Sequence, residues 1–397
     1  MCPSYMATRD EIHSTRGRAR LIYEALSGDL LKEGLADEAV HNALELCLSC
    51  KACKSECPAA IDMAAYKAEL LHNYYQRHRR PLATELLGRF HACARAGAFL
   101  PALANLFTQG ALASWSRRLM GFHPDRRLPR FAAQNFRAWF RHHVPRNPAA
   151  SEVLLFVDTF NNFFEPQVAI AATEVLERAG FRVIIPARDL CCARPLYEAG
   201  MLDRARVRLA EMLAELDPIA ARGVAIVGLE PSCLLTLRDE LPAMFPRSGA
   251  ARRLSDQAML FDEFIGAQAP AAVSAKLTRL TGRALVHPHC HAKALAKGGA
   301  EVALLRRAAG LAIEVPDAGC CGMAGAFGYG AQRFALSRSI GERVLLTAIR
   351  ASSPETLVIA DGFACRTQIR QFCPGRQPLH LAQVLNSDTG EDGAGEG

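Results

Sequence analysis

Residues 47–58 have the sequence Cys47-Leu48-Ser49-Cys50-Lys51-Ala52-Cys53-Lys54-Ser55-Glu56-Cys57-Pro58. Three thiols follow one another at two-residue gaps, a fourth comes after three more residues, and a proline closes the run. A cubane iron–sulfur cluster takes one thiolate per iron atom, so a short loop can hold three corners only if its cysteines recur at every third position. The spacing therefore predicts a [4Fe–4S] cluster on Cys47, Cys50 and Cys53.

The remaining ligand is expected from outside this loop, because in bacterial ferredoxins the thiol of the Cys-Pro pair normally serves a different cluster. The chain begins Met1-Cys2-Pro3, which is similar to the end of a second Cys-Pro motif. We therefore expect Cys2 to complete the cluster, and an unligated Cys2 is the alternative. Cys57 is expected to belong to another cluster, whose other ligands would lie upstream of Met1. A zinc knuckle is the alternative to iron, although zinc sites more often pair two CxxC hairpins.

Composition indicates two or three domains in 397 residues, half of which are hydrophobic. The 14 cysteines are clustered in motifs and are too sparse for a disulfide scaffold. No charged-then-apolar leader opens the sequence, so we expect reduced thiols in a cytoplasmic compartment, with metal binding as their use. No glycine-rich dinucleotide fingerprint and no serine or cysteine nucleophile constellation is found.

The net charge of +7 is modest, but arginines and aromatic residues alternate between Arg117 and Arg146. This stretch suggests a docking face for a partner or an anionic membrane surface, and solvated helix faces are the alternative. Nucleic acid is not expected, because no binding motif accompanies the charge. The most apolar window, 94–113, contains Pro101 and Gly110, so no transmembrane helix is predicted and peripheral membrane contact is left open.

Helix start signals precede three segments around the cysteine loop. Ser14, Asp37 and Asp62 can cap helices over about 15–26, 38–46 and from 63 onward. We expect these helices to shield the cluster from water, and further helices to continue over 82–143 up to a boundary at about 145–148.

From Ser151 onward, short β-branched runs alternate with amphipathic helices, which predicts βαβ units and parallel sheets. The expected strands are 153–157, 182–185, 224–227, 284–287, 312–315 and 357–360. Among the expected helices are 167–179, 203–216 and 332–350. The predicted fold class is α followed by α/β, with a helical ferredoxin-type domain (1–145) and two pseudo-repeated α/β cysteine-rich domains (146–275 and 276–397).

Cysteines recur where these strands end, and the carboxyl ends of parallel strands meet at one edge of a sheet. In the second half this places four thiols together and predicts a second cluster, on Cys290, Cys320, Cys321 and Cys365. Gly322 and Gly325 would let the backbone approach the cluster closely, and the helices that start near Cys233 and Cys365 could present amides to it. Buried structural thiols are the alternative.

The first half repeats the pattern less completely, with Cys191, Cys192 and Cys233. Its first strand ends at Asp158 without a thiol, and Ala193 stands where the second half has a glycine. This half therefore holds either a cluster with one non-cysteine ligand or no cluster. Three histidines crowd the Cys290 loop, and we favour hydrogen bonding over metal ligation for them; they are His287, His289 and His291.

The cysteines of the second half, with the string Cys320-Cys321-Gly322, resemble the cysteine-rich "CCG" domain. That domain occurs in heterodisulfide reductases, in the iron–sulfur subunit of glycolate oxidase and in one subunit of anaerobic glycerol-3-phosphate dehydrogenase. Longer strings resemble the iron–sulfur half of FAD-linked D-2-hydroxyacid dehydrogenases. These strings are Met1-Cys2-Pro3-Ser4-Tyr5-Met6-Ala7-Thr8-Arg9, His13-Ser14-Thr15-Arg16-Gly17-Arg18-Ala19, Gly228-Leu229-Glu230-Pro231-Ser232-Cys233-Leu234-Leu235-Thr236 and Gly319-Cys320-Cys321-Gly322-Met323-Ala324-Gly325.

This resemblance implies electron transfer through clusters, from a flavin that oxidises D-lactate, glycolate or D-2-hydroxyglutarate to a quinone or cytochrome. It implies that FAD lies on a flavoprotein partner or on a missing N-terminal domain, and that this chain, from a truncated, split or mis-started gene, turns over no substrate alone. The expected location is cytoplasmic, with peripheral contact at the inner face of the cell membrane left open. The alternatives are a heterodisulfide-reductase-like enzyme acting at the CCG cluster and a zinc-stabilised scaffold without redox work.

Overall fold

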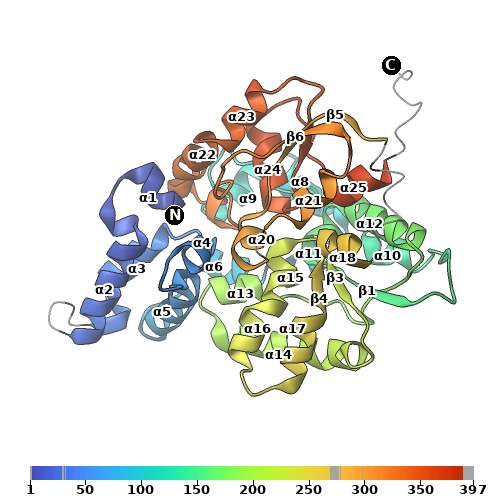
Figure 1. Ribbon diagram of the computed structural model, residues 1–397. Coiled ribbons are helices and arrows are strands. Elements are labelled where there is room, and N and C mark those ends of the chain that lie inside the picture. Colours follow the sequence, from blue (N-terminus) through green and yellow to red (C-terminus); the bar gives the residue numbers. More distant parts are fainter. Residues whose placement is uncertain are drawn as a thin grey trace.

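The N-terminal third of the chain is helical, as Figure 1 shows for the computed structural model, which describes residues 2–28, 31, 33–268, 277, 279–296 and 298–387. The helices around the cysteine loop are α1 (Pro3–Thr8), α2 (Thr15–Ser27), α3 (Glu38–Glu45), α4 (Ala52–Glu56) and α5 (Met63–Arg77). The predicted caps are confirmed, because Ser14, Asp37 and Asp62 accept hydrogen bonds from the first-turn amides of α2, α3 and α5. Side chains from α2, α3 and α5 enclose Cys47 in a small apolar core.

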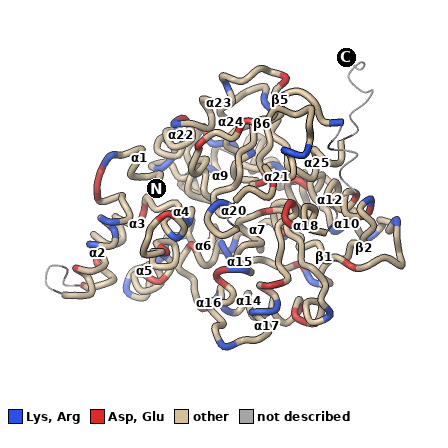
Figure 2. Tube along the Cα trace, viewed as in Figure 1, with Lys and Arg blue, Asp and Glu red and all other residues tan. Residues whose placement is uncertain are grey.

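The helical extension continues with five shorter helices that lead to the first sheet. They are α6 (Leu82–Gly88), α7 (Phe90–Gly97), α8 (Pro101–Thr108), α9 (Ala113–Leu119) and α10 (Phe136–Phe140). Within the predicted basic stretch, Arg126 is fully buried and Arg137 donates to the carbonyls of Pro186 and Ala187. These two arginines are therefore used within the protein, and a docking role for the rest of the stretch stays a prediction. Figure 2 shows both signs of charge spread over the elements in view.

The first parallel sheet has the strand order β2-β1-β3-β4. Its strands are β1 (Glu152–Phe156), β2 (Arg182–Ile184), β3 (Ile226–Gly228) and β4 (Ala258–Leu260). Its helices are α11 (Thr159–Phe163), α12 (Pro166–Arg178), α13 (Arg194–Glu198), α14 (Leu202–Ala220), α15 (Pro231–Arg238), α16 (Glu240–Met244), α17 (Gly249–Gln257) and α18 (Phe261–Gln268). Central β1 pairs Leu154 with Ile184 on one side and Ile226 on the other. The three predicted strands are confirmed to within two residues, and β4 was not predicted.

The second parallel sheet has the order β6-β5-β7. Its strands are β5 (Thr281–Val286), β6 (Gly310–Glu314) and β7 (Leu357–Ile359), and its helices are α20 (Cys290–Leu295), α21 (Ala300–Leu305), α22 (Phe334–Glu342), α23 (Leu345–Ala351), α24 (Phe363–Phe372) and α25 (Leu381–Asn386). The single helix expected over 332–350 is wrong. The backbone of Val344 leaves the helical region at φ −144°, and Leu345 and Leu346 then turn into the core.

One apolar core joins the two sheets. Val153 and Leu155 of β1 share it with Ala284 and Val286 of β5, and α25 packs against α12 (Figure 1). The other face of each sheet has a core of its own, formed with α14 and α17 in the first case and with α22, α23 and α24 in the second. Burial of these apolar side chains holds the carboxyl ends of the strands, and the loops that follow them, in fixed positions.

Candidate metal centres

The predicted N-terminal cysteine group is Cys2, Cys47, Cys50 and Cys53. All four residues line one pocket that is partly open to solvent. The loop turns sharply because Ser49 and Lys51 adopt left-handed backbone angles, with φ of 52° and 61°. The structure therefore brings Cys2 together with the three loop cysteines across more than 40 residues of sequence.

Arg18 gives this pocket a positive charge next to Cys2. The guanidinium is buried, donates to the carbonyl of Ala43 at 2.8 Å and lies 3.2 Å from the sulfur of Cys2. Burial raises the pKa of the Cys2 thiol, but Arg18 and hydrogen bonds to the sulfur outweigh it, so the net pKa is lowered. The thiolate is the form that binds metal, so this environment suits a ligand. The sequence alone assigned no role to Arg18, which appeared only within the motif 13–19.

Cys57 lies outside this pocket. It ends α4, and its amide donates to the carbonyl of Cys53 at 3.1 Å. Cys93 is exposed in α7 and does not line the pocket either. The assignment of Cys57 to another cluster stays a prediction.

The second cysteine group is Cys290, Cys320, Cys321 and Cys365. Its members follow β5, β6 and β7, as predicted, and three of the four are buried. Cys320 hydrogen bonds with Cys290, and hydrogen bonds from Cys320 and Cys365 lower the pKa of Cys321. The structure therefore gathers thiols from three separate loops around one acidic thiol.

Two glycines fix the backbone around the second cysteine group. A Cβ atom on Gly322, whose φ is 90°, would lie 2.1 Å from the carbonyl oxygen of Ser337 in α22. A Cβ atom on Gly362 would lie 2.4 Å from His289 Cδ2 and 3.2 Å from Cys365 Sγ. Gly322 is therefore needed for packing against α22, whereas the expected close approach to the metal site is found at Gly362.

The first cysteine group is Cys191, Cys192 and Cys233. The sulfurs of Cys192 and Cys233 lie 3.2 Å apart, and hydrogen bonds from Cys191 and Cys233 lower the pKa of Cys192. Ala193 has a φ of 61°, so it makes the left-handed turn that Gly322 makes in the other half. Asp158 takes the place after β1 and caps α11 by accepting from the amides of Phe160 and Asn161. Cys192 therefore contacts both other thiols, and the residue that follows β1 is a capping carboxyl group in place of a thiol.

Two histidines of the Cys290 loop, His289 and His291, make hydrogen bonds, whereas neither ring nitrogen of His287 has a hydrogen-bond partner among the described residues. His289 accepts from the amide of His291 at 3.1 Å, and burial lowers the pKa of His289 to about 3. His291 Nε2 donates to the carbonyl of Ser49 at 3.0 Å. His287 is buried directly after β5 and contributes to the lowered pKa of Cys321. The hydrogen bonds of His289 and His291 agree with the preference for hydrogen bonding over metal ligation, which stays a prediction for His287.

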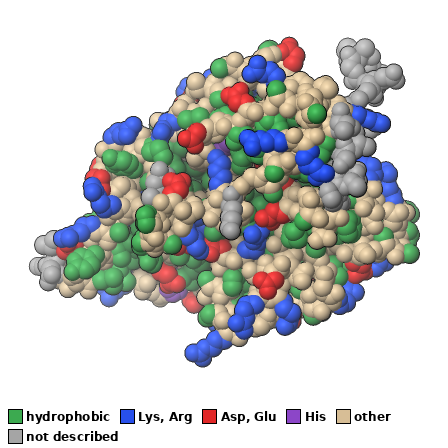
Figure 3. Space-filling model, in the orientation of Figure 1, with side chains coloured by type: hydrophobic (Ala, Val, Ile, Leu, Met, Phe, Trp, Pro, Cys, Tyr) green, Lys and Arg blue, Asp and Glu red, His purple; other side chains and the backbone are tan. Residues whose placement is uncertain are grey.

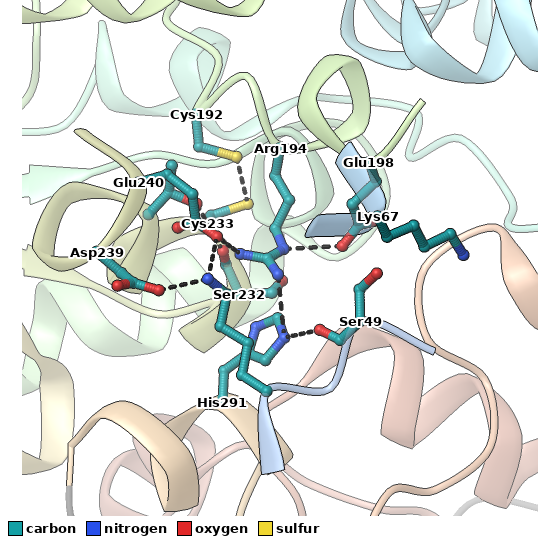
Figure 4. Close-up of polar contacts among 12 residues, drawn as sticks. Ser49, Lys67, Cys192, Arg194, Glu198, Ser232, Cys233, Asp239, Glu240 and His291 are labelled. Carbon is teal, nitrogen blue, oxygen red and sulfur yellow. Dashed lines mark hydrogen bonds and ion pairs between the residues drawn. The ribbon is translucent and has the colours of Figure 1, made fainter. Parts of the chain in front are cut away.

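A buried network of charges joins the N-terminal loop to both sheets (Figure 4). Arg194 donates to Glu198 and Glu240 at 2.9 Å each, and its Nη2 lies 3.2 Å from His291. Lys51 Nζ lies 2.8 Å from Glu240 and also pairs with Asp239 of the first sheet unit. Sequence reasoning missed this network, because its members are distant in sequence and carry no motif.

Among the described residues, no three His, Cys, Asp or Glu side chains converge in the way that one bound metal ion requires. A cubane is held differently, since each thiolate meets its own iron atom. The N-terminal cysteine group can supply one thiolate to each iron atom, because four thiols line one pocket and Arg18 favours the charged form of Cys2. Which thiols hold iron stays a prediction.

Comparison with known proteins agrees with this arrangement. The family described as "4Fe-4S dicluster domain" matches residues 1–62, and the family described as "Cysteine-rich domain" matches residues 157–238 and 284–370. The D-2-hydroxyglutarate dehydrogenase of Pseudomonas putida is 27% identical over 97% of this chain, which covers 41% of the relative. A subunit of the anaerobic glycerol-3-phosphate dehydrogenase of Escherichia coli is 27% identical over 66% of each chain.

A third relative is lactate utilization protein A of Bacillus velezensis, which is 29% identical over 59% of this chain and 99% of its own length. The chain thus spans about two fifths of the D-2-hydroxyglutarate dehydrogenases that it matches, whereas it covers nearly the whole of lactate utilization protein A. The residues matched by the two family models include all three cysteine groups. The chain therefore contains, in this order, a segment that matches the 4Fe-4S dicluster domain family and two segments that match the cysteine-rich domain family.

Proposed function

We propose that this chain is the electron-transfer part of an FAD-linked D-2-hydroxyacid dehydrogenase. It accepts electrons from a flavin on a partner subunit or on a preceding domain, and it delivers them to a quinone or cytochrome. The proposal is supported by the match of 97% of the chain to D-2-hydroxyglutarate dehydrogenase and by the iron–sulfur character of its domains. The chain's own residues then hold and insulate the electron carriers, and oxidation of the hydroxyacid belongs to the flavin.

The observation that carries this proposal is the contact between the N-terminal and second cysteine groups. Leu48 of the loop is buried in the same apolar core as Cys320, Cys321 and Cys365. The pKa of Cys50 is raised well above its ordinary value, first by burial and next by the nearby Cys290. The two groups therefore lie next to each other, which suits electron transfer from one to the other.

When bound, [4Fe–4S] clusters supply one-electron transfer, and this chain's residues set the surroundings that tune it. Cys47, Cys320, Cys321 and Cys365 are buried, which limits the access of water to both groups. Hydrogen bonds from neighbouring thiols lower the pKa of Cys321 while raising the pKa of Cys320 and Cys365, and Arg18 helps to lower the pKa of Cys2. Solvent exclusion and hydrogen bonds to sulfur are among the features by which a protein sets the reduction potential of a cluster.

We further propose that the two sheet units are pseudo-repeats, with boundaries near 146–275 and 276–397, and that the first cysteine group holds a third cluster. Both sheets place their first strand in the centre, between the second and the third. Ala193 and Gly322 share the left-handed turn after the paired cysteines. These parallels support one ancestral plan, in which Asp158 or a neighbouring group replaces the fourth thiol.

The test uses anaerobically purified full-length chain, titrated with a chemical reductant and followed by EPR. We expect separate signals from the N-terminal and second cysteine groups, with Cys50→Ser removing one and Cys290→Ser the other; Cys93→Ser, at an exposed thiol, is the matched control. Adding the flavin-domain fragment of a related dehydrogenase and a D-2-hydroxyacid should then reduce the clusters. Unchanged clusters in that mixture, or disulfide reduction by the chain alone, would refute the proposal.

A further inference from the structure

The segment 99–119, which contains α8 and α9, exposes an unusual amount of apolar surface. In the described part of the chain, eight of the sixteen exposed large apolar side chains lie in these 21 residues. They are Phe99, Leu100, Leu103, Leu106, Phe107, Leu112, Trp115 and Leu119. Phe99 is 79% exposed and Trp115 is 58% exposed. Contiguous apolar surface of this kind marks an interaction site in a folded protein.

The polar side chains of the same segment point the other way, into hydrogen bonds that hold it to the body of the protein. The side chain of Asn105 donates to the carbonyl of Phe131 at 3.0 Å and accepts from its amide at 2.9 Å. Gln109 donates to the carbonyl of Leu128 at 2.6 Å, and the hydroxyl of Ser116 donates to the carbonyl of Phe107. Hydrogen bonds of Asn105, Gln109 and Ser116 thus fix the hairpin of α8 and α9, while its apolar side chains are in solvent.

The charge around this hairpin has one sign. Residues 86–124 contain no Asp or Glu, whereas they contain Arg95, Arg117, Arg118 and also Arg89, which pairs with Glu85. Arg95 and Arg118 are exposed. By contrast, on the face shown in Figure 3 apolar, basic and acidic side chains are interspersed. Figure 1 shows α8 and α9, drawn faint, behind the second sheet and away from that face.

We propose that the hairpin of α8 and α9 docks on an anionic lipid bilayer, with its Phe, Leu and Trp side chains in the interfacial layer and its arginines at the headgroups. Lipid is favoured over a protein partner because the hairpin's polar side chains are already used internally. A protein interface of ordinary size needs about one hydrogen bond per 100–200 Å². A bilayer surface needs only apolar side chains, an interfacial indole and cations.

The hairpin lies on the membrane and does not cross it. The eight residues of α8 extend about 12 Å, well short of the hydrocarbon core of about 30 Å. No helix in the described ranges is long and apolar enough to span a bilayer. This mode of attachment does not depend on which substrate or electron acceptor the chain serves.

The test is co-sedimentation of the full-length chain with vesicles of two compositions, phosphatidylcholine alone and phosphatidylcholine with phosphatidylglycerol in equal parts. We expect binding to the anionic vesicles and about a tenfold or greater loss of partitioning in the Phe99→Ser/Trp115→Ser variant. Arg95→Glu/Arg118→Glu should weaken binding about fivefold for each charge lost. The matched control is Leu26→Ser/Val207→Ser, at apolar side chains 68% and 58% exposed elsewhere, which should bind like the unaltered chain.

A spectroscopic readout tests the location independently of binding strength. The chain has two tryptophans, so Trp139→Phe leaves Trp115 as the single indole. Its emission should shift to the blue on anionic vesicles and be quenched by brominated lipid. Absence of vesicle binding, unaltered binding by the Phe99→Ser/Trp115→Ser variant, or a dimer that this variant converts to a monomer would each overturn the proposal. The last result would assign the surface to a second copy of the chain.

Discussion

Replacing Lys51 with methionine tests whether the buried charge network fixes the cysteine loop on the sheets. The side chain is 1% exposed, and its ammonium group lies 2.8 Å from Glu240 and 3.1 Å from Asp62 and also pairs with Asp239. Burial alone would lower the pKa of Lys51, but the carboxylates of Glu240, Asp239 and Asp62 outweigh it and raise the pKa. The side chain is therefore charged at every working pH, and Lys51→Met removes a full charge while nearly keeping the length of the side chain.

Removing one partner from a buried ion pair costs about 3–5 kcal/mol, because the other charge is left without compensation. The structure favours the lower end of this range. Glu240 keeps Arg194 at 2.9 Å, and Asp239 and Asp62 keep Lys54. We therefore expect a loss of about 3 kcal/mol in the free energy of unfolding. For a cooperatively unfolding unit of about 150–250 residues, that loss lowers the unfolding midpoint by roughly 6–12 °C.

The assay is thermal unfolding of the cluster-loaded chain, followed by circular dichroism and by visible absorbance. The matched control is Lys54→Met, which loses the same kind of pair at a side chain that is 34% exposed, and which should cost less than about 1 kcal/mol. The Lys51→Met/Glu240→Gln variant should be destabilised by less than the sum of its single changes, because the two groups interact directly. A Lys51→Met midpoint equal to that of Lys54→Met would refute the reasoning.

Three further changes test other parts of the structure. Burial, with a contribution from Asp361, raises the pKa of Asp262 from 3.8 to about 7. The stability that Asp262 contributes is therefore present below the pKa of the unfolded chain and is lost as the pH rises through about 7. Asp262→Asn should raise the thermal midpoint more at about pH 8 than at about pH 5, and equal shifts at the two pH values would contradict this. Gly362→Ala should lower the iron content by displacing the second cysteine group, whereas Gly266→Ala, which meets open space, should keep the iron content of the unaltered chain. Arg126→Met should speed proteolysis within residues 121–131, because buried hydrogen bonds of Arg126 hold this segment to Gly328, Ser337 and α24. Arg126→Lys should not restore resistance to proteolysis, because a single ammonium group cannot make the several directed hydrogen bonds of a guanidinium group.

Much of the fold could be predicted because its signals are local. The caps at Ser14, Asp37 and Asp62 and the six predicted strands depend on neighbouring residues, and all of them are present. Strand β4 was missed because it is three residues long and directly follows α17, without a turn signal before it. The break at Val344 was missed because it arises from packing of the following leucines into the core.

The cysteine groups could be predicted in part, since strand ends that share one edge bring their loops together. The contacts that hold these loops could not, because they join residues without a common motif. Lys51 pairs with Glu240 across 189 positions, and His291 reaches the carbonyl of Ser49 across 242. Such pairs are chosen by the tertiary arrangement of buried charges, which local patterns do not encode.

The most direct test of the central claim is iron and acid-labile sulfide analysis of the anaerobically purified chain, with EPR of the reduced protein. The account predicts iron and sulfide in equal amounts, sufficient for at least two [4Fe–4S] clusters, and a reduced spectrum broadened by interaction between the N-terminal and second cysteine groups. A colourless chain that holds zinc and no sulfide would contradict it.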